Sequence, residues 1–377
     1  MAAGTSTPLN LLGYSRSQLT ELLAQWGEPR FRATQLVKWM HRRGVTDYAA
    51  MTDVSRKLRE RLARETEIAL PEIALEKASG DGTVKWVLRL HDGNAIETVY
   101  IPESGRGTLC ISSQVGCALD CTFCSTAQQG FNRNLTAAEI IGQVWLAMQR
   151  LPAPEGRPRA VSNVVLMGMG EPLANYDAVV AACQLMTDDN AYGLSRRRVT
   201  LSTSGLVPAL DRLSEHTDVA LAVSLHAPND ELRDRLVPIN RKYPIARLME
   251  SCRRYVEATG AHSGVTFEYV LLAGVNDRPE HANQLAGVLR GIPGKINLIP
   301  FNPFPGAPFD RPAEPDIERF ERQLQKAGYV TTVRRTRGDD IDAACGQLVG
   351  QVEDRTNRGM RMIRLHAELP DRPRRAS

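Results

Sequence analysis

The sequence predicts an α/β protein built on a parallel sheet that curves into a barrel or part of one. Two observations predict this fold class. After Gly107, short β-rich runs recur along the chain, and each ends in Gly, Pro, Asn or Asp. Most of these runs lead into a stretch whose apolar residues have helical spacing. Strands that alternate with helices in this way usually pair in parallel, because each helix returns the chain along the sheet.

The composition is that of a soluble globular protein. The chain has 377 residues, 42% apolar and 24% charged, which is enough for one large domain and an accessory piece. Its net charge of +4 is compatible with nucleic acid but does not by itself indicate it. Seven cysteines, an odd number, make a secreted disulfide framework improbable. No signal peptide or membrane-spanning run is found, so a cytoplasmic protein is expected.

Residues 1–67 are expected to form a helical accessory domain. Three stretches between Leu11 and Glu67 have apolar residues at helical spacing, with Gly27 and Gly44 as stops. Basic side chains are frequent here, and two interpretations remain open. They either form a solvent-exposed surface or bind the phosphate backbone of a nucleic acid. In the second case the binding affinity would fall steeply as salt is added.

Residues 68–106 are expected to form a β extension. TVKWVLRL and AIETVYI read as consecutive antiparallel strands, with turns at Asp81-Gly82 and Asp92-Gly93. Glu97 lies inside the second strand, and the residue pattern alone places it on the solvent-exposed face.

Residues 107–350 are expected to form the barrel, and residues 351–377 a C-terminal extension with a basic tail. TLCIS leads into a cysteine-rich loop, and the later strand runs end in polar residues. These polar residues are Gly170, Glu171, Ser202, Ser224, His226 and Asn302. Active sites of such barrels form at the C-terminal ends of the strands. Some of these residues are alternatively helix caps, but polar groups at successive strand ends favour a site.

Three cysteines lie close together in CALDCTFC, at Cys117, Cys121 and Cys124. Thiolates at this spacing can bind one iron–sulfur cluster, but they are three where an electron-transfer cluster takes four. The remaining iron would be open to a non-protein ligand, which is typical of a catalytic cluster. Two alternatives are a zinc site with a distant fourth ligand and a coincidental group of buried cysteines.

At CALDCTFC the sequence resembles the radical S-adenosylmethionine (SAM) superfamily, whose hallmark is a CxxxCxxC loop after the first barrel strand. Longer blocks are similar to the RlmN-type adenine-C2 methyltransferases of ribosomal and transfer RNA. These blocks are SSQVGCALDCTFCSTAQQGFNRNL, NVVLMGMGEPLAN, TLSTSG, AVSLHAP, LIPFNPFPG and TRGDDIDAACGQL. The resemblance extends to Gln347 without a departure at a motif position. It implies a partial (βα)6 TIM-like barrel of the radical SAM type, with a helical N-terminal domain and a β-hairpin extension.

The resemblance also implies roles for individual residues. Cys117, Cys121 and Cys124 would hold a [4Fe–4S] cluster, whose open iron would bind SAM. The implied SAM contacts are Gly170, Glu171, Ser202, Ser224, Leu225, His226 and Asn302. Cys345 matches the methyl-carrying cysteine, Cys110 the second catalytic cysteine and Glu97 the proton acceptor.

The implied chemistry follows from the target atom. Adenine C2 is electron-poor and is no nucleophile, so methylation there requires a carbon radical. In the family mechanism one SAM methylates Cys345, and a second is cleaved to a 5′-deoxyadenosyl radical that takes hydrogen from the S-methyl group. The methylene radical adds to C2, and Glu97 removes the C2 proton. Cys110 then attacks the Cys345 sulfur, which releases the product and leaves a transient disulfide.

Without the resemblance, the residue pattern favours non-catalytic roles for the other cysteines. Cys110 in a strand is more typical of a small buried hydrophobe, and Cys345 beside a glycine is equally consistent with an inert or a reactive thiol. The resemblance assigns catalysis to both. Cys183 and Cys252 lie on apolar or amphipathic helices and are interpreted as structural.

The implied partners are 23S rRNA, at the peptidyl-transferase centre, and certain tRNAs, 3′ of the anticodon. A flavodoxin-like electron donor and a monomeric state are also expected. The target base must leave its stack, so an unpaired or opened RNA site is expected. Candidate RNA contacts are Arg196, Arg197, Arg198, Arg334, Arg335 and Arg337. Arg337 is the best candidate for a contact with an RNA phosphate. Arg196, Arg197 and Arg198 are by default interpreted as solvent-exposed surface residues.

Three rival functions remain. The nearest is methylation of adenine C8 by the sister family, which uses similar cysteine chemistry. A radical SAM reaction on a small molecule or protein gives no role to Cys110 and Cys345. A non-catalytic RNA-binding factor with a structural zinc belongs to another class.

Overall fold

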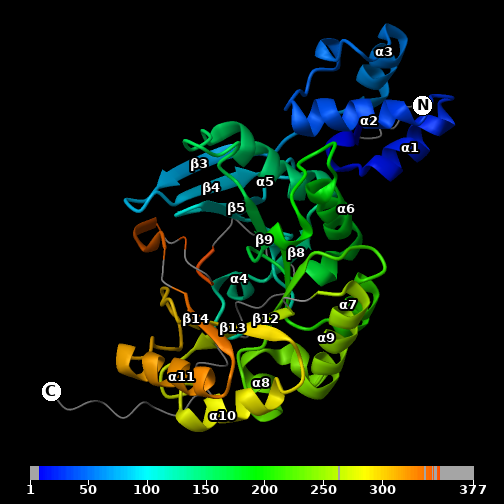
Figure 1. Cartoon of the computed structure of the whole chain (residues 1–377). Helices are drawn as coiled ribbons and strands as arrows, with labels where there is room; N and C mark the ends of the chain where they lie inside the picture. Colours follow the sequence, from blue (N-terminus) through cyan, green and yellow to red (C-terminus); the bar gives the residue numbers. More distant parts are fainter. Residues whose placement is uncertain (1–7, 262–263, 335–336, 342, 344–345, 349–377) are drawn as a thin grey trace, which may run out of the picture.

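The N-terminal part of the protein is helical. The computed structural model describes residues 8–261, 264–334, 337–341, 343 and 346–348. Helices α1 (Arg16–Gln25), α2 (Phe31–Val37) and α3 (Arg56–Glu65) lie together, apart from the large sheet (Figure 1). Ser15 and Ser55 accept backbone N–H groups at the starts of α1 and α3, which satisfies donors that have no partner within the helix. The three helices predicted for this region are present.

A meander of three antiparallel strands follows the helices. Its strands are β3 (Glu72–Ala78), β4 (Val84–Arg89) and β5 (Ala95–Glu103). The two connecting turns contain Gly82 and Gly93, both with positive φ, as the Asp-Gly pairs predicted. A separate short pair, β1 (Leu9–Asn10) with β2 (Thr66–Glu67), joins the two ends of the helical region.

One ten-stranded sheet holds the meander and the parallel strands together, in the order β14-β13-β12-β11-β10-β9-β6-β5-β4-β3. The parallel strands are β6 (Arg106–Cys110), β9 (Asn163–Leu166), β10 (Val199–Thr203), β11 (Ala220–Ser224), β12 (Val265–Leu271), β13 (Gly294–Pro300) and β14 (Val330–Val333). Strand β6 pairs antiparallel with β5 and parallel with β9. The predicted parallel α/β sheet is therefore present, and β14 adds one parallel strand to a six-strand pattern in the described residues.

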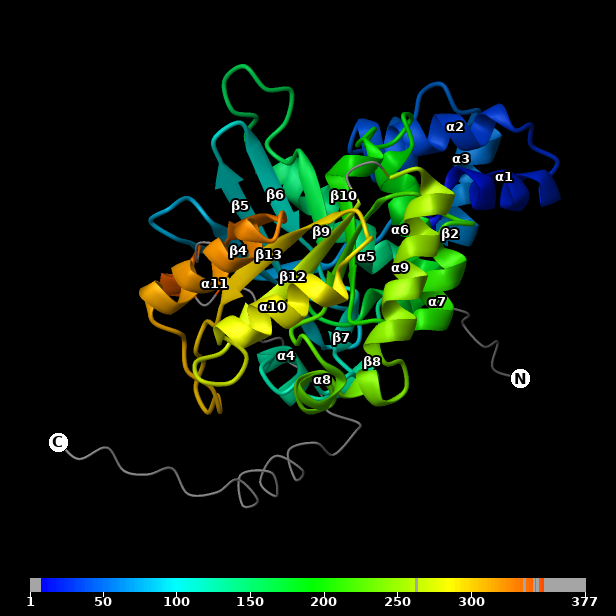
Figure 2. The same ribbon diagram turned by 60° about the horizontal axis from the view of Figure 1, so that its bottom comes forward.

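Helices cover the outer side of the curved sheet. They are α5 (Ala137–Arg150), α6 (Tyr176–Thr187), α7 (Val207–Leu213), α8 (Asp230–Leu236), α9 (Ile245–Thr259), α10 (Pro279–Val288) and α11 (Glu314–Lys326). Figure 2 shows α9, α10 and α11 lying along β10 to β13. The apolar side chains between the sheet and most of these helices form a large buried core, and those of α8 belong to a second, smaller cluster with Val270 and Phe301. Among the described residues, no helix has the length and apolar character that crossing a membrane requires.

A short hairpin presents the cysteine loop. Strands β7 (Gln114–Gly116) and β8 (Phe131–Asn134) pair antiparallel, and the loop and helix α4 (Ser125–Gln128) lie between them. Gly116 has a φ of +76°, and a Cβ there would lie 2.1 Å from the carbonyl oxygen of Gly130. Only glycine allows this approach, so the hairpin closes tightly beneath the loop.

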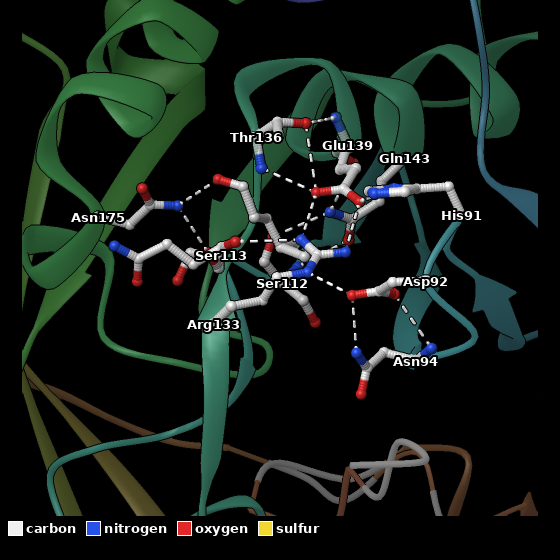
Figure 3. A network of polar contacts seen from close by, with 12 residues as sticks. His91, Asp92, Asn94, Ser112, Ser113, Arg133, Thr136, Glu139, Gln143 and Asn175 are labelled. Atoms are coloured by element: carbon white, nitrogen blue, oxygen red, sulfur yellow. Dashed lines mark hydrogen bonds and ion pairs between the residues drawn. The ribbon is translucent and has the colours of Figure 1, made fainter. Parts of the chain in front are cut away.

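A buried polar network fixes the chain between β6 and β7 (Figure 3). Gln143 of α5 accepts the N–H of Ser112 at 2.8 Å and donates to its carbonyl at 2.9 Å. The Ser112 hydroxyl donates to the carbonyl of Glu97 at 2.7 Å and accepts the N–H of Met169 at 2.9 Å. Asn175 donates to the carbonyl of Ser113 at 2.8 Å. These bonds supply partners for backbone groups that lie outside the strands.

An ion-pair network joins the β4–β5 turn to the start of α5 (Figure 3). Arg133 of β8 donates to Asp92 at 2.6 Å and to both carboxylate oxygens of Glu139 at 2.8 and 2.9 Å. Glu139 also accepts the N–H of Thr136, which completes a capping box at the start of the helix. The Arg133 guanidinium, together with hydrogen bonds from Asn94, holds the pKa of Asp92 well below its usual range.

The lowered pKa of Asp92 leads to a pH-dependent prediction. A carboxylate with a depressed pKa stabilises the fold above the pKa of the unfolded chain, and this contribution is lost as the pH falls towards the folded value. The substitution Asp92→Asn should therefore lower the free energy of unfolding by about 1 kcal/mol at pH 7, and by less at pH 3.5. Urea unfolding at the two pH values measures the difference. Asp189→Asn, at an exposed residue, is the control, and a cost for Asp92→Asn that is equal at both pH values would contradict the prediction.

Candidate active site

One cavity lies at the C-terminal ends of the parallel strands, where the barrel pattern predicted a site. It is lined by nine of the predicted site residues: Cys117, Cys121, Cys124, Gly170, Glu171, Ser202, Ser224, His226 and Asn302. These residues come from the cysteine loop and from the segments at the ends of β9, β10, β11 and β13. The fold thus brings together polar groups that are up to 185 positions apart in the sequence.

The three loop cysteines lie close enough to affect one another's ionisation. Burial raises the pKa of Cys121 well above its usual value, and the neighbouring Cys117 and Cys124 raise it further. Three neighbouring thiolates repel one another and require a positive group among them. Thiolate sulfur is the ligand that iron–sulfur clusters use, so this donor set fits such a cluster. Among the described residues, no three His, Cys, Asp or Glu side chains are grouped so as to hold a single metal ion.

Glu171 is a buried carboxylate whose oxygens are both fixed by backbone donors. It accepts the N–H of Leu173 at 3.0 Å and the N–H of Ser204 at 2.8 Å. Burial raises the pKa of Glu171, and these hydrogen bonds oppose that shift. Its neighbour Gly170 has a φ of +100° and lies against Gln114. The loop after β9 therefore presents a rigid carboxylate to the cavity.

Two hydroxyls lie on the adjacent strands β10 and β11, and a neutral imidazole follows β11. The hydroxyl oxygens of Ser202 and Ser224 are 3.5 Å apart. Nδ1 of His226 accepts the N–H of Val270 at 3.0 Å, and the His226 ring meets the Phe123 ring edge-on at 4.7 Å. Burial lowers the pKa of His226 to about 3, so the ring is neutral near pH 7 and its hydrogen is on Nε2. The side chain therefore links the cysteine loop to β12 without adding charge.

Leu225, also predicted to contact SAM, is fully buried and is not among the residues that line the cavity. Its backbone N–H donates to the carbonyl of Glu268, and its carbonyl accepts from Arg233. It therefore belongs to the wall behind the cavity surface.

Glu97 is buried, so the solvent-exposed position that the residue pattern gave it is wrong. Its side chain is 5% exposed, and its Oε1 lies 3.2 Å from Nζ of Lys85 on β4. Glu97 lies on the same face of the sheet as Val99, which is paired with Cys110 of β6. The register thus places Glu97, Lys85 and Cys110 on one face, although none of them lines the cavity.

The described residues after β14 return to the turn between β3 and β4. The N–H of Gly338 donates to Asp81 at 3.2 Å, and Ile341 and Ala343 are buried. Cys345 lies outside the described residues. Gly346 lines the cavity, and its carbonyl accepts the N–H of Ser125 at 2.9 Å.

Six of the seven cysteines are described, and no disulfide joins any two of them. The transient disulfide between Cys110 and Cys345 therefore has no support here and stays a prediction. Cys183 and Cys252 are buried on α6 and α9, and burial raises the pKa of each thiol to about 12. Such thiols are poor nucleophiles, which agrees with a structural role.

The sequence interpretation missed two charged residues of the site. Glu268 of β12 lines the cavity and accepts from the Asn297 side chain at 2.9 Å. Arg233 of α8 is fully buried behind the strand ends. A carboxylate inside the apolar run VTFEYVLL was a usable signal for Glu268. Arg233 lies in DELRDRL, which reads as an ordinary charged helix.

The candidate RNA-contacting arginines are mostly on the surface. Arg196, Arg197 and Arg198 are exposed, and Arg196 pairs with Asp218. Arg337 is 44% exposed, and its Nη1 lies 3.6 Å from Asp81. Arg335 lies outside the described residues.

The family comparisons agree with this fold and site. Residues 111–286 match the family described as the radical SAM superfamily, and residues 9–68 match the ribosomal RNA large subunit methyltransferase N-terminal domain. The cysteine loop, β9–β12 and most of the lining residues lie within the first match. The fold and the site together define a radical SAM enzyme.

Close relatives narrow the class. The chain is 58% identical over 367 residues to the dual-specificity RNA methyltransferase RlmN of Marinobacter nauticus, covering 97% of this chain and all of the relative. Identity to the protein of the same name from Pseudomonas putida is 57%, with 97% and 98% coverage. The chain belongs to the family of dual-specificity RNA methyltransferases RlmN. The predicted enzyme class, a radical SAM RNA methyltransferase, is therefore confirmed, and the family implies the predicted [4Fe–4S] cluster and SAM.

A solved structure shows the same architecture. The radical SAM methyltransferase from Sphaerobacter thermophilus is 47% identical and superposes with a TM-score of 0.82. The match covers 90% of this chain and 99% of that chain. The predicted partial barrel of the radical SAM type is confirmed.

The tight turn at Gly170 gives a prediction for the site. A Cβ at Gly170 would lie 2.5 Å from Cβ of Gln114, whereas a Cβ at Gly306, whose φ is also positive, would meet nothing within 4 Å. Gly170→Ala should cost about 2–4 kcal/mol of unfolding free energy, and Gly306→Ala about 1 kcal/mol, because only the first adds overlap to backbone strain. Chemical denaturation of both variants measures the difference. Equal costs would contradict the packing described for the loop after β9.

Proposed function

We propose that this chain methylates C2 of adenosine in 23S rRNA, at the peptidyl-transferase centre, and in certain tRNAs, 3′ of the anticodon. The observation that carries the proposal is that Cys117, Cys121 and Cys124 line one cavity with the polar strand ends. The names of relatives at 57% and 58% identity support the RNA substrates. The sister reaction at adenine C8 and a zinc-containing RNA-binding factor are not favoured, because the relatives carry neither name.

The residues around the cavity suit the two cofactors. Cys117, Cys121 and Cys124 would hold the [4Fe–4S] cluster, and the loop and strand-end residues would hold SAM. Together these groups supply the one-electron radical chemistry that the electron-poor C2 atom requires. Glu171, fixed by two backbone donors, suits an ammonium group. Ser202 and Ser224, two adjacent hydroxyls, suit a carboxylate or a ribose.

Glu97 is proposed to accept the C2 proton. Its carboxylate is buried, and Lys85 places a positive charge 3.2 Å away. An adjacent positive charge favours the ionised carboxylate, which is the form that accepts a proton. Burial also limits the access of water that would compete as a proton source.

Cys345 is proposed to carry the methyl group and Cys110 to release the product. Cys110 ends β6 on the face shared with Glu97, and both residues are buried. The release step forms a sulfur–sulfur bond between the two cysteines while the bond from the Cys345 sulfur to the methylene carbon breaks, and that carbon takes up a proton to become the new methyl group. A reductant must then restore the two thiols before the next turnover.

The helical region and the surface arginines are proposed to hold the RNA. Arg30, Arg42 and Lys57 of the N-terminal helical part are exposed. Their charge would bind phosphates without reading sequence. A flavodoxin-like electron donor, a monomeric state and a cytoplasmic location complete the proposal.

Methylation by the loaded enzyme tests the function. The protein is reconstituted anaerobically with iron and sulfide and given SAM, a reductant and a 23S rRNA fragment or tRNA. Mass spectrometry of the digested RNA should locate the methyl group on C2. Cys345→Ala should abolish the product, whereas the buried control Cys183→Ala should retain it. A methyl group on C8, or a protein that takes up zinc and never cleaves SAM, would overturn the proposal.

RNA binding should weaken steeply as salt is added. Each phosphate that a lysine or arginine neutralises releases counterions, so the logarithm of the binding constant falls linearly with the logarithm of salt concentration. Arg42→Ala should reduce this slope by about one unit, since it removes one exposed charge. Arg56→Ala is the matched control, because Glu60 already pairs with Arg56 at 2.7 Å. Fluorescence anisotropy with labelled RNA gives both slopes. A flat salt profile would remove the phosphate-binding role of the helical region.

A further inference from the structure

Arg233 is a fully buried arginine at the back of the cavity. Its side chain is 0% exposed and donates four hydrogen bonds. The acceptors are the carbonyls of Leu225, Ser204 and Ser224, at 3.0, 2.7 and 3.1 Å, and the side-chain oxygen of Asn240 at 2.9 Å. All four acceptors are neutral, so they fix the guanidinium in place without cancelling its charge. Burying a charge in this way is costly and calls for a functional reason.

The helix that carries Arg233 packs directly on the cysteine loop. The N–H of Thr122 donates to the carbonyl of Leu236 at 3.1 Å. Cys121 and Phe123 pack against the buried cluster that contains Leu236. A guanidinium stays protonated in proteins at neutral pH. Arg233 therefore places a positive charge on the helix that packs against Cys121 and its neighbours in the loop.

We propose that Arg233 is a positioning residue whose fixed positive charge beside Cys121 raises the reduction potential of the cluster. This inference rests on the proposed function. A cluster held by three thiolates is negatively charged, and its negative charge grows when it accepts an electron. A buried positive charge therefore stabilises the reduced form more than the oxidised form. The hydrogen bonds to the strand ends hold that charge at a fixed distance.

A merely structural role would hold the strand ends and leave the potential unchanged. The helix offers a second way to vary the local charge. Asp234, one residue after Arg233, accepts from Asn240 at 2.6 Å, and Asn240 in turn accepts from Arg233. Removing the Asp234 charge adds net positive charge near Arg233 without removing any Arg233 hydrogen bond. Arg235, exposed on the same helix, provides the matched control.

The experiment measures the midpoint potential of the reconstituted full-length protein by redox titration followed with EPR spectroscopy. Arg233→Met should shift the potential to more negative values, and Asp234→Asn should shift it to less negative values. Arg235→Met should leave it at the wild-type value, because solvent screens an exposed charge. Iron and sulfide content and the thermal unfolding temperature are measured for each variant.

The measured potentials of these variants either support or overturn the proposed role of Arg233. A wild-type potential in Arg233→Met with a full cluster would overturn it. If Arg233→Met fails to fold or to hold the cluster, Asp234→Asn decides instead, and an unchanged potential there overturns it. Failure of the wild-type protein to take up a cluster counts against the proposed function and not against the role of Arg233, so the two failures are distinguishable.

Discussion

The hydrogen bonds at Ser112 are the constraint on which the site depends. Through its backbone and hydroxyl, this residue joins α5, β5 and the loop after β9. It also follows β6, the strand at which antiparallel pairing gives way to parallel pairing. Because these hydrogen bonds hold Ser112 in place, the segment that leads into the cysteine loop starts from a fixed position. They also keep β5 in register with the parallel strands. A shift of one residue at β5 would turn Glu97 to the opposite face.

Buried charges are concentrated around the site. Glu97 with Lys85, Glu171 and Arg233 are all buried there. Such groups contribute little net stability, since desolvation offsets their attraction, yet removing one partner of a buried pair costs about 3–5 kcal/mol. Their arrangement therefore reflects chemistry more than folding. Each is fixed by named hydrogen bonds or by an ion pair, so little reorganisation is required when charge moves.

The sequence predicted the elements and most of the cavity, because both follow from local patterns. Strand runs ending in polar residues placed Ser202, Ser224 and Asn302 correctly at one cavity. The burial of Glu97 was not predictable, because a charged residue inside a strand is most often exposed, and its partner Lys85 is identified only by the pairing of β4 with β5. Arg233 was missed for a similar reason. A charged helix looks exposed until the strand ends that accept its hydrogen bonds are known.

The antiparallel meander that carries Glu97 also creates a new sheet edge. Strand β3 ends the ten-stranded order, and most of its residues are exposed. An open edge with unpaired backbone groups is a template for association with another chain. Glu72, Glu76 and Lys77 are exposed along this strand, and a register irregularity lies between Ile73 and Leu75. Charge and irregularity discourage a further strand from pairing there, so the β extension is also protected against aggregation.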